Sequence, residues 1–311
     1  METRDWDELK LSRLMLGTVQ FGLPYGVANR TGQPSYGEVR AIVAAAIEGG
    51  VTCFDTAAAY GASEEVLGKA LRELQAAERV VVVTKVRALT PGERADGRLA
   101  SRAVRESVQA SRRRLGIDSP LPLVLFHREE DAVFLDELLA LRDLGWLRHA
   151  GVSCDNRPGP AARFAADPRV RALQLPCNLL DPRHARAGSL RAAAAGGVAV
   201  FIRSVYLQGL LAMPEAAVPA ALQGVLPVRR QLEAIARQAG LSLTALAVRA
   251  MLAREGATCV LVGVETLSQM RGNLALFAQG PLPADLLAAV DAAVPALPEA
   301  WITPSMWAGK G

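Results

Sequence analysis

The segment VTCFDTAAAYG (residues 51–61) sets the pattern that decides the fold: an apolar run, Thr52–Phe54, ends at a polar residue, Asp55, and a loop follows. Similar short apolar runs recur along the chain, and eight occur in all: Arg13–Leu16, Thr52–Phe54, Val80–Val83, Leu121–Phe126, Ala150–Val152, Ala172–Leu175, Val198–Ile202 and Cys259–Val262. Continuous apolar runs are typical of strands in parallel sheets that are covered on both faces. The sequence therefore predicts eight buried parallel strands.

Stretches with helical spacing separate these runs, for example Val39, Ile42, Val43, Ala46 and Ile47, and glycines follow many of them. A repeated strand–helix unit fits either an open doubly wound sheet or a closed barrel. The open dinucleotide-binding sheet needs a G-x-G-x-x-G turn after its first strand, which this chain lacks. Eight units in roughly 250 residues instead favour a (β/α)₈ barrel.

The remaining segments extend this barrel, and no composition break divides the chain, so we expect one domain over residues 1–311. The loop Arg203–Val228 is long and contains three prolines, and loops of this length inside compact domains are usually functional. An extra helix is expected over Leu282–Val294, and an irregular tail over Trp301–Gly311.

Composition excludes several classes of protein. Of 311 residues, 51% are hydrophobic and 21% charged, which is too apolar for disorder. No apolar run reaches the ~18 to 20 residues of a membrane span, and Met1–Lys10 lacks the apolar core of a signal peptide. These features predict a cytoplasmic protein that does not enter membranes.

The net charge of +4 is scattered, and the densest basic run, Arg112–Arg114, has no interleaved aromatic residues. We therefore expect a solvated helix face there and no nucleic-acid partner. The four cysteines are too far apart for a C-x-x-C pair and are expected to be buried, reduced thiols. With three histidines, His127, His149 and His184, and no paired cysteine, we expect no metal site.

Polar residues stand where several of the expected strands end, and a barrel enzyme builds its active site at those ends. Asp55, Lys85 and His127 close three successive strands, and Tyr60 lies in the loop after Asp55. These four side chains are expected to face one opening of the barrel.

The four residues form a coherent acid–base set. The ammonium of Lys85 would lower the pKa of Tyr60 from its ordinary value near ~10, and Asp55 would pair with Lys85 because an unpaired buried charge is costly. His127 would donate a hydrogen bond to a carbonyl oxygen. Tyr60 could then act as the acid in a reduction, or the base in an oxidation, with a nicotinamide cofactor supplying or accepting hydride.

Each residue also has a simpler interpretation. Lys85 could be an exposed charge at a strand end, Tyr60 could pack within its loop, and His127 could be structural. Asp55 could cap a helix that begins near Ser63. These interpretations do not explain why the four residues reach the same opening in strand order.

Several motifs together resemble the aldo-keto reductase family, from about Leu11 to Phe277: LGTVQFG (16–22), FDTAAAYG (54–61), SEEVLG (63–68), Thr84-Lys85, His127, GVS (151–153), QGLL (208–211) and GVET…N (263–273). The resemblance implies a (β/α)₈ barrel that reduces an aldehyde, ketone or sugar carbonyl with NAD(P)H. Its catalytic tetrad would be Asp55, Tyr60, Lys85 and His127.

The resemblance also implies cofactor contacts along one side of the opening. Ser153 and Gln174 would hold the nicotinamide carboxamide, and Gly17 and Thr18 would lie along the cofactor. The remaining contacts would come from two later loops: Arg203, Ser204 and Gln208 near the nicotinamide and pyrophosphate, and Gly263, Gln269 and Asn273 around the adenosine.

Three positions depart from the family pattern. Cys154 replaces an asparagine, and Arg203 stands where an aromatic residue often stacks on the nicotinamide, a role that a planar guanidinium can also fill. Glu265-Thr266 occupies a stretch that often carries a basic residue for the 2′-phosphate. The expected cofactor is NADPH, with NADH usable, and the expected substrate is a small carbonyl compound.

The sequence also permits two other functions. The chain could be a non-catalytic NAD(P)H-binding regulatory subunit, similar to the potassium-channel β-subunits of the family, although no partner protein is implied by the sequence. It could also be a barrel hydrolase or isomerase, which would not bind nicotinamide.

Overall fold

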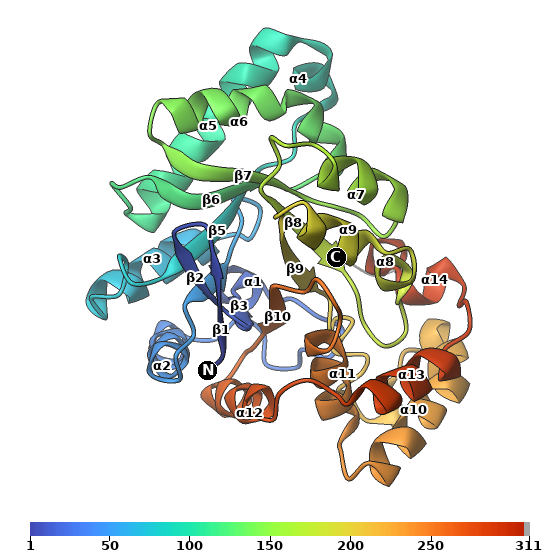
Figure 1. Ribbon diagram of the computed structural model, residues 1–311. Coiled ribbons are helices and arrows are strands. Elements are labelled where there is room, and N and C mark those ends of the chain that lie inside the picture. The colour runs from blue at the N-terminus through green and yellow to red at the C-terminus, as the bar shows by residue number, and fades with distance from the viewer. Residues whose placement is uncertain (308–311) are drawn as a thin grey trace.

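The computed structural model describes residues 1–307 and shows a closed barrel of eight parallel strands (Figure 1). In the barrel the strands follow one another in sequence order: β3 (Leu14–Gly17), β4 (Cys53–Asp55), β5 (Val81–Val86), β6 (Leu121–Phe126), β7 (Leu147–Ser153), β8 (Ala172–Pro176), β9 (Ala199–Arg203) and β10 (Cys259–Gly263). β10 pairs with β3 and closes the ring. The predicted (β/α)₈ architecture is confirmed.

Helices surround this barrel (Figure 1). Their bounds are α1 (Val19–Gly22), α2 (Tyr36–Glu48), α3 (Ser63–Glu73), α4 (Pro91–Ala95), α5 (Gly97–Leu115), α6 (Leu135–Asp143), α7 (Pro158–Ala165), α8 (Arg183–Arg186), α9 (Ser189–Ala195), α10 (Leu226–Gln238), α11 (Leu243–Leu252), α12 (Leu267–Ala278), α13 (Ala284–Ala293) and α14 (Glu299–Ile302). Residues 1–307 also contain four short 3₁₀ helices: η1 (Glu129–Phe134), η2 (Glu215–Ala217), η3 (Ala220–Val225) and η4 (Pro304–Met306).

The alternation of side chains along each strand divides the buried residues into two cores. Met15, Cys53 and Phe201 belong to a small cluster of strand residues, whereas Leu16 and Phe54 belong to the larger cluster shared with the helices. Successive residues of a strand point to opposite faces, so each strand contributes to both cores. This is why the strands are apolar throughout.

An N-terminal hairpin, β1 (Thr3–Trp6) and β2 (Leu9–Ser12), was not expected from the sequence. Trp6 and Leu9 pack against the small cluster, and the Trp6 indole donates a hydrogen bond to the Gly197 carbonyl oxygen at 3.1 Å. Gly197 lies two residues before β9, so the hairpin covers the amino-terminal end of the barrel. Its short, charged strands gave no clear apolar run.

The hairpin turn brings Asp7 and Glu8 next to His149, with the three donor atoms within 4.8 Å of one another. These carboxylates already have cationic partners: Arg171 donates to both oxygens of Asp7 at 2.9 and 2.6 Å, and Arg148 lies 3.5 Å from Glu8. The cluster is therefore an ion-pair network that fastens the hairpin to β7 and the segment before β8.

The C-terminal segment agrees with the sequence in part. α13 lies within the helix expected over Leu282–Val294. The expected irregular tail instead contains α14 and η4, and Trp301 packs on Gly224 of η3. The last expected tail residues, 308–311, lie outside the described residues.

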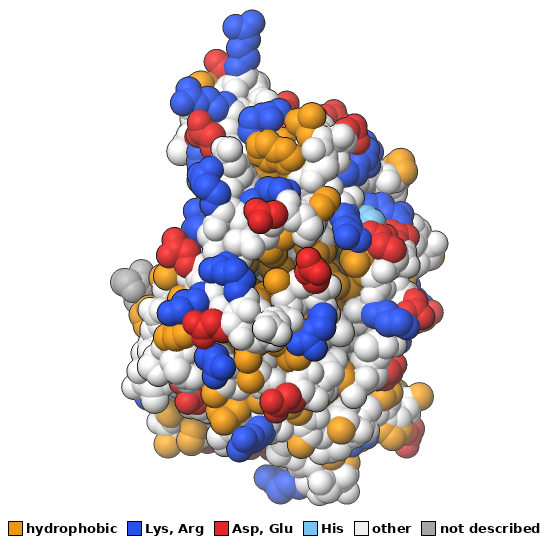
Figure 2. All heavy atoms as spheres, turned by 90° about the vertical axis from the view of Figure 1, so that its left-hand side faces the viewer, with side chains coloured by type: hydrophobic (Ala, Val, Ile, Leu, Met, Phe, Trp, Pro, Cys, Tyr) orange, Lys and Arg blue, Asp and Glu red, His pale blue; other side chains and the backbone are white. Residues whose placement is uncertain are grey.

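The outer surface mixes both charges. On the face in Figure 2, basic and acidic side chains are interspersed with apolar ones. The basic run on α5 is only partly solvated, which corrects the sequence expectation: Arg114 pairs with buried Glu64 at 2.6 Å, and Arg112 donates to the Trp146 and Asp118 carbonyl oxygens. Among the helices of residues 1–307, none is long and apolar enough to cross a membrane.

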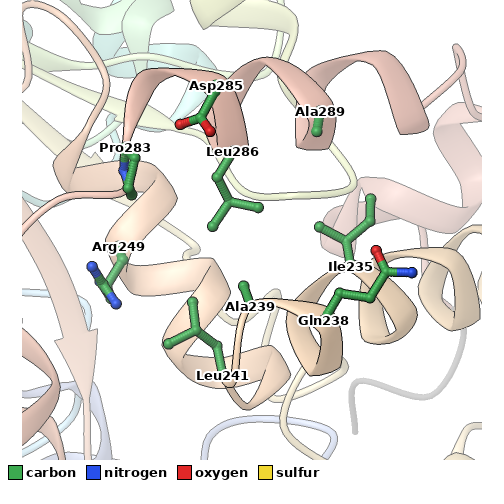
Figure 3. Close-up of a pocket in the computed structure, with 9 residues that line it drawn as sticks. All are labelled: Ile235, Gln238, Ala239, Leu241, Arg249, Pro283, Asp285, Leu286 and Ala289. Atoms are coloured by element: carbon green, nitrogen blue, oxygen red, sulfur yellow. The ribbon is translucent and has the colours of Figure 1, made fainter.

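All four cysteines are buried and free, as expected. A surface pocket between α10, α11 and α13 is lined by Ile235, Leu241 and Leu286, with Arg249 and Asp285 at its edge (Figure 3). None of the residues expected to form the functional site lines this pocket.

Candidate active site

The structure brings Asp55, Lys85 and Tyr60 into direct contact at the carboxyl end of the barrel. Lys85 is fully buried, and its ammonium donates to Asp55 Oδ1 at 2.7 Å, to the Thr56 carbonyl oxygen at 2.9 Å and to the Tyr60 hydroxyl at 3.4 Å. Asp55 therefore does not cap α3, whose N-cap is Ala62. The buried ammonium is neutralised by Asp55 and aimed at the phenol.

His127 follows β6 and lies beside Tyr60. The two rings meet edge to face with their centroids 5.6 Å apart. Burial lowers the pKa of His127 to about 3, and the nearby charges of Lys85, Arg203 and Arg128 act in the same direction. The imidazole is therefore neutral at physiological pH, and a neutral ring has one N–H to donate.

The pKa of Tyr60 is shifted in the opposite direction from the sequence prediction. Burial raises it above its ordinary value, and the carboxylate of Asp55 adds to the rise, whereas Lys85 lowers it by a smaller amount. The predicted action of Lys85 is present, but the prediction of a net lowered pKa is wrong because desolvation of the phenolate outweighs it. In this environment Tyr60 holds its proton.

Two glycines explain how the Tyr60 loop is held. A Cβ on Gly22 would lie 1.9 Å from the Tyr60 carbonyl oxygen, and Gly61, with φ of +55°, has the Gly22 carbonyl oxygen 2.5 Å from its own Cβ position. The loops after β3 and β4 thus touch backbone to backbone, which only glycine at both positions permits. This contact explains why both motifs, LGTVQFG and FDTAAAYG, end in glycine.

A buried hydroxyl network supports the same loop and was missed by the sequence reasoning. The Ser63 hydroxyl donates to the Thr18 carbonyl oxygen at 2.7 Å, and the Thr18 hydroxyl donates to the Asp55 carbonyl oxygen at 2.9 Å. Thr56 lies 3.0 Å from the Ser63 hydroxyl. Thr18, expected beside a cofactor, is fully buried in this network. Ser63 was visible only as part of a helix start.

The residues expected at the nicotinamide lie next to the tetrad. Ser153, the last residue of β7, pairs in register with Gln174 in the middle of β8, and both are buried. The Gln174 amide donates to Asp55 Oδ1 at 2.7 Å, so this oxygen accepts from both Gln174 and Lys85. Arg203 at the end of β9 donates to the Cys154 carbonyl oxygen at 3.0 Å.

The loop after β9 has an unusual backbone. Ser204, Leu207 and Gln208 have positive φ values of 63°, 48° and 54°, a conformation rare for residues other than glycine that clusters at ligand clamps. Within residues 1–307, the backbone N–H groups of Val205, Tyr206 and Gln208 donate no hydrogen bond. Successive free N–H groups beside left-handed residues are typical of anion-binding loops.

This loop is bridged to the loop after β3. The Gln208 amide donates to the Tyr25 hydroxyl at 3.1 Å, and the Ala28 N–H donates to the Gln208 carbonyl oxygen at 3.4 Å. The two loops therefore meet above the barrel end between β3 and β9.

The residues expected around an adenosine form a second group. Gly263 pairs in register with Gly17, and a Cβ on Gly263 would lie 2.6 Å from Gln20 Oε1. The Asn273 side-chain oxygen accepts from the Tyr206 hydroxyl at 2.9 Å. The Gln269 side-chain oxygen accepts from a backbone N–H in the turn before α12, that of Glu265, at 2.6 Å.

Glu38 is a second residue that the sequence reasoning missed. Although it lies on α2, its carboxylate accepts the Leu267 N–H at the start of α12, at 2.6 Å. Glu265, in the same turn, is half-buried, and burial raises its pKa. Two carboxylates thus stand at the helix start where a 2′-phosphate would be expected to bind.

These features fit a nicotinamide dinucleotide. Gln20 Oε1 is buried and has no hydrogen-bond partner among the described residues, and it lies against the backbone of Gly263. Free N–H groups after β9 suit a pyrophosphate, and Ser153 and Gln174 offer polar atoms for a carboxamide beside Tyr60. The opening therefore carries polar groups spaced along one edge, from β7 round to β3.

Comparisons with known proteins agree with this fold. The structure is similar to aldo-keto reductase AKR11C1 from Bacillus halodurans (holo form), with a TM-score of 0.79 over 97% of this chain and 99% of that chain, at 21% identity. In sequence, this chain is 35% identical to the uncharacterized oxidoreductase Mb2320 of Mycobacterium bovis over 46% of this chain. It is also 35% identical to aldo-keto reductase YhdN of Bacillus subtilis over 45% of this chain.

These sequence matches span 42% and 43% of the two relatives, less than half of either. The model of the aldo/keto reductase family matches far more of the chain, residues 13–295, and this range contains all eight barrel strands, from β3 to β10. The chain therefore belongs to the aldo/keto reductase family.

Proposed function

We propose that the protein is an NAD(P)H-dependent oxidoreductase that reduces the carbonyl group of an aldehyde, ketone or sugar to an alcohol. One observation carries the proposal: the buried Lys85 ammonium contacts both Asp55 and the Tyr60 hydroxyl, at 2.7 and 3.4 Å. A lysine held in this way lies ready to stabilise a phenolate that forms when Tyr60 gives up its proton.

The residues divide the work of a reduction. The neutral His127 donates a hydrogen bond to the carbonyl oxygen and fixes its orientation, while Tyr60 delivers a proton to that oxygen. Lys85 stabilises the resulting phenolate, and Asp55 keeps the ammonium charged and in place. The nicotinamide cofactor supplies hydride to the carbonyl carbon when bound.

The raised pKa of Tyr60 favours the reductive direction. Since burial keeps the phenol protonated at physiological pH, the acid required for reduction is the resting form of the residue. The base required for alcohol oxidation, the phenolate, accumulates only at high pH. We therefore expect reduction to be efficient near neutral pH and oxidation to increase under alkaline conditions.

Both forms of the cofactor are proposed to be usable, NADPH and NADH. The carboxylates of Glu38 and Glu265 at the start of α12 oppose a 2′-phosphate, and Glu265 could instead accept a hydrogen bond from a ribose hydroxyl. Arg271, on the exposed side of α12, is the basic residue nearby in sequence that could offset them. We expect discrimination between the two cofactors to be weaker than about a hundredfold, or roughly 2.7 kcal/mol.

The test follows oxidation of NADPH and NADH, by loss of the reduced nicotinamide absorbance, with a panel of aldehydes, ketones and sugars. Tyr60→Phe should bind cofactor and fold normally but turn over at least about 10²-fold more slowly, the range of a lost general acid. Tyr36→Phe is a matched control, because Tyr36 lies on α2 outside the barrel. Cofactor binding without turnover by the unsubstituted protein would contradict the enzymatic proposal and favour a regulatory subunit.

A further inference from the structure

The guanidinium of Arg203 spans the carboxyl end of the barrel beside the tetrad. One nitrogen donates to the Cys154 carbonyl oxygen at 3.0 Å, and another donates to the Ser204 hydroxyl at 3.2 Å. Cys154 follows β7 and Arg203 ends β9, with β8 between them. The charged group therefore reaches across the end of β8, the strand that carries Gln174.

The charge of Arg203 is not neutralised as that of Lys85 is. Lys85 has the carboxylate of Asp55, but among residues 1–307 no ion pair forms between Arg203 and a carboxylate. Glu129 lies in this region: burial raises the pKa of the Cys154 thiol, Glu129 adds to the rise and Arg203 opposes it, but the Glu129 carboxylate accepts the Asp155 N–H at 3.1 Å. The tetrad and its surroundings thus contain one cation without a paired carboxylate.

The charge of Arg203 acts on the two groups that would hold a carbonyl oxygen, His127 and Tyr60. For His127, burial, Lys85 and then Arg203 each lower the pKa. For Tyr60, where burial raises the pKa, Arg203 opposes the rise together with Lys85. A hydride donor must lie against the carbonyl carbon that Tyr60 and His127 position, so it must also lie within the field of Arg203.

Hydride transfer changes the charge of the nicotinamide ring, which is cationic when oxidised and neutral when reduced. We propose that Arg203 makes the site select the reduced cofactor over the oxidised one, because its unpaired positive charge repels the oxidised ring. The proposal rests on the proposed function. It gives this arginine a role in cofactor exchange, in which the oxidised product is held less tightly than the reduced reactant.

The test measures dissociation constants of the reduced and oxidised cofactors separately, by quenching of tryptophan fluorescence, with no turnover involved. Arg203→Met should lower the ratio of the oxidised to the reduced dissociation constant by at least about tenfold, equivalent to about 1.4 kcal/mol. Arg203→Lys retains the charge and should keep the ratio within about threefold of its original value. Using the ratio cancels any loss of packing that weakens both forms equally.

Arg128→Met is a matched control. Arg128 follows His127 and its charge also acts on that residue, but its side chain is 59% exposed and lies 3.4 Å from Glu130. This substitution should leave the ratio unchanged. If the unsubstituted protein binds neither cofactor, the proposed function and this inference both fail. If it binds both and Arg203→Met leaves the ratio unchanged, only the inference is overturned.

Discussion

Replacing Lys85 by methionine tests the central electrostatic contact of the proposed mechanism. Methionine has a similar length but no charge, so Tyr60 would lose the ammonium that stabilises its phenolate. Lys85→Met should therefore raise the pKa of Tyr60 further above its already elevated value. The pH at which alcohol oxidation increases should move upwards, and carbonyl reduction should become slower.

The size of the effect follows from the 3.4 Å between Lys85 Nζ and the Tyr60 hydroxyl. At this distance two unit charges attract by about 1 kcal/mol in water and by about 5 kcal/mol at an effective dielectric constant of ~20. Since one pKa unit equals ~1.36 kcal/mol, the shift should lie between about 1 and 3.5 units. If the phenolate is largely formed in the transition state, reduction slows by about tenfold or more.

The assay is the rate of alcohol oxidation as a function of pH, supported by absorbance titration of tyrosinate. Lys69→Met provides the control, because Lys69 lies 4.0 Å over the ring of another tyrosine, Tyr36, outside the barrel. Since Lys85→Met leaves Asp55 buried without its partner, the double substitution with Asp55→Asn separates loss of the ammonium from the added carboxylate. An oxidation profile with the same inflection in all these proteins would refute the reasoning.

Three further predictions test other parts of the site. Gly22→Ala would place a Cβ 1.9 Å from the Tyr60 carbonyl oxygen, so we expect slower turnover and a loss of about 1 to 3 kcal/mol of stability, measured by thermal melting; turnover equal to that of the original protein would show that the contact is unimportant. His127 has its pKa lowered from 6.5 to about 3 in the folded state, so the unfolded chain binds the additional proton in this window and stability falls as the pH falls through it. In urea unfolding, His127→Gln should flatten this dependence by up to ~1.4 kcal/mol per pH unit, and an equally steep dependence would contradict the assignment. Glu265→Arg should improve binding of NADPH relative to NADH by about tenfold, or ~1.4 kcal/mol, whereas Glu255→Arg, an exposed control before β10, should not; equal effects of the two substitutions would exclude a local role.

The barrel was predictable because its signal is local. Each strand is buried on both faces, so its residues are apolar without interruption, and all eight expected runs overlap the observed strands. The hairpin β1–β2 escaped detection because its residues are mostly exposed, and Thr3, Arg4 and Asp5 carry no apolar pattern. The positions of Asp55, Lys85 and His127 followed from the rule that parallel strands end at the same side.

What the sequence did not provide were contacts between residues far apart in the chain. Glu38 and Leu267 are separated by 229 residues, and neither lies in a motif that indicates their hydrogen bond. The pKa of Tyr60 was also out of reach, because the sequence showed the neighbouring charge of Lys85 but not the depth of burial that outweighs it. Such quantities depend on how completely water is removed, which only the packed structure defines.

The backbone contact between Gly22 and Gly61 has a consequence for engineering. It supports the proposed proton donor from the loops after β3 and β4, together with the hydroxyl of Ser63. The long segment 204–225 bonds to the loop after β3 farther along that loop, at Tyr25 and Ala28. We therefore expect that a chimera that receives segment 204–225 and the C-terminal helices from a relative will change its substrate preference. Tyr60 should keep its position in such a chimera.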